Sequence, residues 1–90
     1  MNVIKRNGTT EKFNFEKIKN AVNKAFKAQY QFDAPDDLIA YLENVASTFT
    51  DDKSVEEIQN FVEDSLMQFK WFDVARSYIS YRDRHNSIRN

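Results

Sequence analysis

Cysteine is absent from the chain, and glycine, proline, histidine and tryptophan each occur once among its 90 residues. The lack of cysteine excludes disulfide bonds, thiolate nucleophiles and thiolate metal ligands. A single histidine, His85, gives no basis for a zinc site, so we expect no metal-binding residues. No apolar run approaches the roughly 18 residues of a membrane span, and the N-terminus lacks a signal peptide's apolar segment. We therefore expect a cytoplasmic protein that does not enter a membrane.

The chain also lacks an excess of charge of either sign. Its 13 lysine and arginine residues are matched by 14 aspartate and glutamate residues, for a formal net charge of −1. Because non-specific affinity for nucleic acid needs a positive surface, we expect no direct nucleic-acid binding. A glycine-rich phosphate loop is absent too, which argues against a catalytic ATPase and leaves no candidate catalytic residue. Any bound anion must be held by a local cluster of cations.

The single glycine predicts where the chain first turns. Asn7-Gly8 supplies the two positive-φ positions of a type I′ turn, and β-tolerant side chains flank it over residues 2–6 and 9–13. The sequence therefore predicts an N-terminal β-hairpin.

Apolar residues at helical spacing predict four helices after the hairpin. We place them at about 15–29, 35–49, 54–69 and 72–85. Asn14 is placed to cap the first helix, and Pro35 suits the first turn of the second because its missing N–H is harmless there. The start of the third helix is the clearest, because Ser54-Val55-Glu56-Glu57 has the form of a capping box.

Short connections between these elements predict an α+β fold over residues 1–90 as a single domain. We expect a small bundle of about four helices, with the N-terminal β-hairpin covering one end or face of it. Most of the eight phenylalanines, four tyrosines and one tryptophan fall at positions that face the core. Trp71 and Phe72 lie in a break between helices and are better candidates for a partner surface.

Three cations of the N-terminal region could converge on one ligand. Lys5 and Arg6 are adjacent and point to opposite faces of an ideal strand, but Arg6 lies at the turn, where its planar guanidinium could swing round to phosphate oxygens. Lys17 lies one turn into the first helix, near amide groups that favour an anion. Glu11 and Asn14 are the natural specificity groups, with a surface charge and a helix cap as their structural alternatives. The pattern suggests a ligand that carries phosphate.

The ordered motifs of the chain resemble those of the ATP-cone family over nearly its whole length. The residues that carry this resemblance are Val3-Ile4-Lys5-Arg6-Asn7-Gly8, Glu11, Phe13, Asn14, Lys17-Ile18, Ser54-Val55-Glu56-Glu57-Ile58-Gln59 and Ala75-Arg76-Ser77-Tyr78-Ile79-Ser80-Tyr81-Arg82. The family is a regulatory nucleotide-binding module of ribonucleotide reductases, and it also occurs in the repressor of their genes. The resemblance implies a helical bundle with a three-stranded sheet, whose third strand would lie near residues 49–53 or 30–33.

The resemblance also implies a role for each candidate nucleotide-binding residue. Val3 would contact the base, Lys5 and Arg6 the phosphates, Glu11 and Asn14 the base or sugar, and Lys17 the phosphates or ribose. Lys53-Ser54 would supply a hydroxyl to a phosphate, although one extra residue separates this hydroxyl from Ile58. Arg84, or alternatively Arg82, would bring a late basic side chain to the phosphates.

The function implied by the resemblance is allosteric control of DNA precursor synthesis. ATP in the cone keeps an attached ribonucleotide reductase active, dATP shifts it toward an inactive oligomer, and the module performs no chemistry. The effector would be ATP or dATP with Mg²⁺, and the partner would be the remainder of the reductase, of which this chain is a fragment. Two alternatives are the cone of a nucleotide-sensing transcriptional repressor and a helical protein-interaction module without nucleotide binding.

Overall fold

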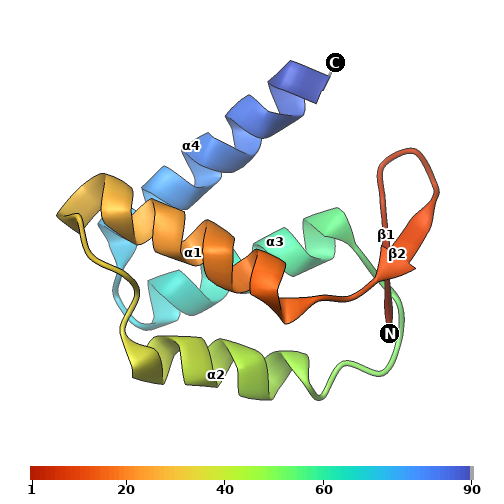
Figure 1. The fold of residues 1–90 in the computed structure, drawn as a ribbon, viewed down its shortest axis with the longest axis horizontal. Helices are drawn as coiled ribbons and strands as arrows, with labels where there is room; N and C mark the ends of the chain where they lie inside the picture. Colours follow the sequence, from red (N-terminus) through yellow and green to blue (C-terminus); the bar gives the residue numbers. More distant parts are fainter. Residues whose placement is uncertain (90) are drawn as a thin grey trace.

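The computed structural model describes the backbone of residues 1–89 and the side chains of residues 1–80. In this part of the chain the elements are β1 (Asn2–Ile4), β2 (Thr10–Lys12), α1 (Phe15–Tyr30), α2 (Asp36–Ala46), β3 (Lys53–Ser54), α3 (Val55–Gln68) and α4 (Phe72–Arg89). Figure 1 shows the hairpin at one end of the helices, on the side where α1 begins. The predicted α+β fold is confirmed.

The three strands form one sheet in the order β2-β1-β3. β1 pairs antiparallel with β2 and parallel with β3, and Val3 lies between Glu11 on one side and Lys53 on the other. Asp52 extends this contact, because its Oδ1 accepts a hydrogen bond of 2.9 Å from the Asn2 amide. The third strand overlaps the first of its two predicted positions at Lys53. It brings the start of α3 beside the hairpin.

The helix starts follow the predicted caps. Asn14 Oδ1 accepts from the Glu16 amide at 3.0 Å, and Ser54 and Glu57 form the complete capping box. Pro35 differs from its prediction: it was expected in the first turn of the second helix, but it is the N-cap residue of α2, which begins at Asp36. That helix ends at Ala46, short of the predicted Phe49, in a segment where the hydroxyls of Ser47 and Thr48 donate to helix carbonyls at 2.6 Å. Such local hydrogen bonds between side chains and the backbone compete with the hydrogen bonds of a helix and are typical of the segment that follows its end.

The core lies where the four helices meet. Its fully buried side chains are Phe26, Leu38, Leu42, Leu66, Val22, Val62 and Val74. Trp71 is partly buried and packs edge-on against Phe26, with ring centroids 5.0 Å apart, whereas Phe72 is 50% exposed. Of this proposed surface pair, Trp71 therefore contributes mainly to the packing of the core. Within residues 1–89, no helix has the length and apolar character needed to cross a membrane.

Candidate functional site

The hairpin loop differs from the predicted type I′ turn. The Gly8 amide donates to the Lys5 carbonyl at 2.9 Å, and the Lys5 amide donates to the Thr9 carbonyl at 2.7 Å. Gly8 has a φ of 86°, while Asn7 is not among the positive-φ residues. The loop is therefore a three-residue connection, Arg6 to Gly8, in which the four-residue turn from Lys5 to Gly8 ends in a left-handed glycine. The prediction of a two-residue Asn-Gly turn was wrong.

The longer loop shifts the pairing of the strands by one residue. A two-residue loop would place Ile4 opposite Glu11, whereas the structure places Val3 opposite Glu11. A shift of one residue exchanges the faces of a strand. As a result, Val3, Lys5 and Glu11 are partly buried on one face, and Ile4 is exposed on the other.

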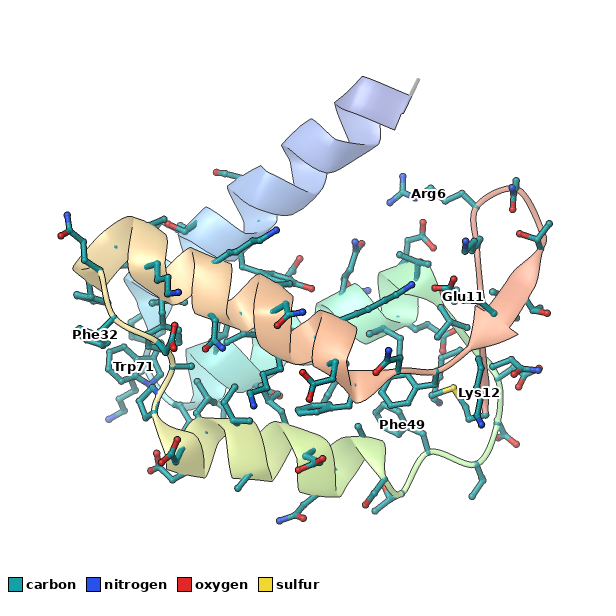
Figure 2. The ribbon with its side chains drawn as sticks, viewed as in Figure 1. Arg6, Glu11, Lys12, Phe32, Phe49 and Trp71 are labelled. Carbon is teal, nitrogen blue, oxygen red and sulfur yellow. The ribbon has the colours of Figure 1, made fainter. Side chains whose placement is uncertain are left out.

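Glu11 is the centre of a small cluster of charges on this face. Its carboxylate contacts Lys17 Nζ at 2.8 Å through Oε1 and Lys5 Nζ at 3.1 Å through Oε2. Hydrogen bonds from Lys17 and then Lys5 hold the pKa of Glu11 below its ordinary value. Figure 2 shows Glu11 on the side of the hairpin that faces the helices. Two cations from separate elements thus share one carboxylate beside the start of α1.

Arg6 extends the cluster toward α3. Its Nε lies 2.9 Å from Oε1 of Glu56, a residue in the first turn of α3. Figure 2 shows the Arg6 side chain reaching from the hairpin loop toward the helices. The sequence indicates Glu56 only as part of the capping motif, because no local pattern indicates a contact with a residue fifty positions earlier. One turn further along α3, Gln59 Oε1 is buried and lacks a hydrogen-bond partner among the described residues.

Asn14, Ser54 and Lys53 already have structural roles. Asn14 and Ser54 accept hydrogen bonds from amides as helix caps, which leaves the Asn14 amide nitrogen and the Ser54 hydroxyl proton outside those two bonds. Lys53 lies beside Val3 in the sheet, but its Nζ is 5.3 Å from the ring centroid of Phe49. The structure therefore brings Val3, Lys5, Glu11 and Lys17 together. It turns Arg6 toward Glu56 and directs the ammonium group of Lys53 toward Phe49.

The side chain of Arg84, the remaining predicted site residue, lies outside the described residues, as does that of Arg82. Two surface hollows occur elsewhere in the described part of the molecule. One, of about 250 Å³, lies between α1 and α4 and is lined by Lys24, Ala25, Ala28, Gln29, Arg76, Ser77 and Ser80. The other, between α2 and α3, includes Phe49 and Lys53. In the charge cluster, the side chains of Lys5 and Lys17 are 42% and 66% exposed, so a ligand can approach them from solvent.

The fold and the cluster together define a small α+β domain whose sheet carries two lysine ammonium groups around one carboxylate. The ATP cone domain family matches residues 1–87, and the chain belongs to this family. It is 36% identical over 98 residues to a ribonucleoside-diphosphate reductase subunit alpha of Chlamydia pneumoniae, covering 97% of this chain and 9% of the relative. A vitamin B12-dependent ribonucleoside-diphosphate reductase of Thermoplasma acidophilum is 38% identical over 94 residues, covering 97% and 12% respectively.

An anaerobic ribonucleoside-triphosphate reductase of Salmonella typhimurium is 39% identical over 83 residues, which cover 89% of this chain and 11% of that protein. The chain thus spans about a tenth of the length of these relatives. The three relatives are different kinds of reductase, so the similarity indicates a module shared among them.

Proposed function

We propose that this chain is an allosteric module that binds ATP or dATP on the Val3–Lys5–Glu11 face of its sheet and controls a ribonucleotide reductase. The observation that carries the proposal is the convergence of Lys5 and Lys17 on Glu11 beside the start of α1, in a chain of the ATP-cone family. Ammonium groups and the amide-rich start of a helix both favour phosphate. The module itself performs no chemistry.

The proposed roles are those that the resemblance to the ATP-cone family implies. Lys5 and Arg6 bind phosphates, Lys17 binds phosphates or ribose, and Val3 packs against the base. Glu11 accepts a hydrogen bond from the base or sugar once the ammonium groups of Lys5 and Lys17 contact a phosphate instead, since a carboxylate can only accept hydrogen bonds. Asn14, Ser54 and Lys53 lie at the edge of this surface and make further contacts.

A divalent cation would enter with the triphosphate. Mg²⁺ keeps several waters and is commonly bound through substrate phosphates with one or two carboxylates. Among the described residues, no three acidic or histidine side chains form a metal cluster, so the phosphates would supply most of the ligands. The Ser54 hydroxyl proton and the basic residues of α4 would complete the phosphate site.

The proposed partner is the remainder of a reductase polypeptide, because the relatives that match this chain are about ten times longer. Binding of ATP would favour the active enzyme, and binding of dATP would favour an inactive oligomer. Each nucleotide can have this effect only if it makes different contacts in the two states. The protein would act in the cytoplasm. A repressor context and a protein-interaction role without nucleotide remain the alternatives.

Calorimetric titration of the chain with ATP and with dATP, each with Mg²⁺, tests the proposal. We expect micromolar binding of both, weakened in Lys5→Ala. Lys12→Ala is the matched control, because Lys12 belongs to the same hairpin but lies on its exposed face. The absence of heat and of any melting shift with either nucleotide would contradict nucleotide binding. Equal losses in the two variants would contradict the proposed face.

A further inference from the structure

Arg6 and Glu56 form an ion pair that joins the hairpin loop to α3. Arg6 Nε lies 2.9 Å from Glu56 Oε1, and the two side chains are 47% and 46% exposed. Half-exposed ion pairs contribute little to folding stability because water screens them and two long side chains lose freedom. A mainly stabilising role is therefore a weak explanation for this contact.

Glu56 is anchored through its backbone in a capped helix. It belongs to the first turn of α3, whose start is held by the hydrogen bonds between Ser54 and Glu57 and by the pairing of β3 with β1. Arg6 lies in the three-residue hairpin loop on a long side chain. A long side chain without a partner must lose its rotamer freedom when a ligand binds it. Contact with a carboxylate on a capped helix can restrict the rotamers of the arginine before the ligand binds.

The atoms of the contact leave Arg6 able to bind a phosphate. The guanidinium group is planar and carries five N–H donors, of which Nε supplies one and the two terminal nitrogens supply four. The contact with Glu56 uses Nε. A phosphate that approaches the terminal nitrogens can form the two parallel hydrogen bonds that arginine favours.

We propose that Glu56 is a positioning residue for the nucleotide phosphates: it contacts Arg6, not the ligand, and holds the guanidinium in the orientation that receives them. This inference rests on the proposed function. The register of the hairpin supports it, because Lys5 is engaged by Glu11 on the sheet face while Arg6, in the loop, is turned toward α3. Lys5 and Arg6 thus contact different carboxylates, Glu11 and Glu56.

Calorimetry on Glu56→Gln tests the proposal, with Glu43→Gln as the matched control. Both changes remove one negative charge from a helix surface, but Glu43 is an exposed residue of α2. We expect ATP to bind about two- to tenfold more weakly to Glu56→Gln than to the control, the factor for immobilising one long side chain. Adenosine, which has no phosphate, should bind equally to both.

A double-mutant cycle separates positioning from a general effect on the fold. In an Arg6→Ala background, Glu56→Gln should cause no further loss of ATP affinity. Tighter binding of ATP by Glu56→Gln than by the control would mean that Glu56 competes with phosphate, and unchanged binding would mean that it does not act on Arg6. Either result overturns the positioning role alone. A wild-type chain that fails to bind ATP overturns the proposed function as well.

Discussion

Replacement of Ser54 by alanine should destabilise the domain by a predictable amount. Ser54 Oγ accepts from the Glu57 amide at 3.1 Å, and the Ser54 amide donates to Glu57 Oε1 at 3.1 Å. Loss of an N-cap serine costs about 1 kcal/mol. At about 2.1 cal/mol/K per residue, unfolding 90 residues has an entropy near 190 cal/mol/K, so the melting temperature should fall by about 5 °C.

Thermal denaturation followed by circular dichroism measures this shift. Ser54→Thr keeps the hydroxyl and should melt close to the wild type. Ser47→Ala is the matched control, because the Ser47 hydroxyl donates to a carbonyl at the end of α2 and caps no amide. Either of two results would refute the reasoning. In the first, Ser54→Ala melts within 1 °C of Ser47→Ala. In the second, Ser54→Thr and Ser54→Ala differ in stability by no more than the roughly 0.5 kcal/mol spread of surface substitutions.

Three further predictions concern the sheet and the core. Because the pKa of Glu11 is lowered, its contacts stabilise the fold at pH values above the ordinary pKa of 4.5. This contribution is lost as the pH falls through the lower pKa of the folded state. Glu11→Gln should therefore reduce the change in melting temperature on acidification. Leu42→Ala, at a fully buried position, should cost about 2–5 kcal/mol in urea denaturation, whereas Met67→Ala, at a position 49% exposed, should cost far less. Gly8→Ala should lower the melting temperature through about 1 kcal/mol of backbone strain at φ 86°, and an unchanged melting curve would contradict the left-handed loop.

The helix starts could be predicted from the sequence because they depend on neighbouring residues. Asn14 and Ser54 cap amides two and three positions away, and these short distances leave a recognisable local pattern. The end of α2 was less predictable, because apolar residues continue to Phe49 after the helix has stopped at Ala46. Apolar residues that pack on the core just beyond a helix can continue the spacing of the helix itself, so the spacing alone does not show where the helix ends.

The proximity of some candidate site residues was predicted, but their geometry was not. Lys5, Glu11 and Lys17 were expected at one place, and the structure shows them in direct contact. Their proposed contacts with a nucleotide stay predictions. The predicted length of the hairpin loop was wrong by one residue, because Asn-Gly is compatible with both a two-residue turn and a three-residue turn. Which turn forms depends on the strand register, and that register is favoured by partial burial of Val3 between two strands.

The sequence by itself determined the α+β fold class, the helix caps and the motifs of the family, because each is carried by residues close together in the chain. Only the tertiary structure decided which carboxylate meets which cation. β3 contains two residues, and its pairing with β1 brings α3 to the hairpin, where Glu56 contacts Arg6. Contacts between residues fifty positions apart are set by the packing of whole elements, and they leave no periodic trace in the sequence.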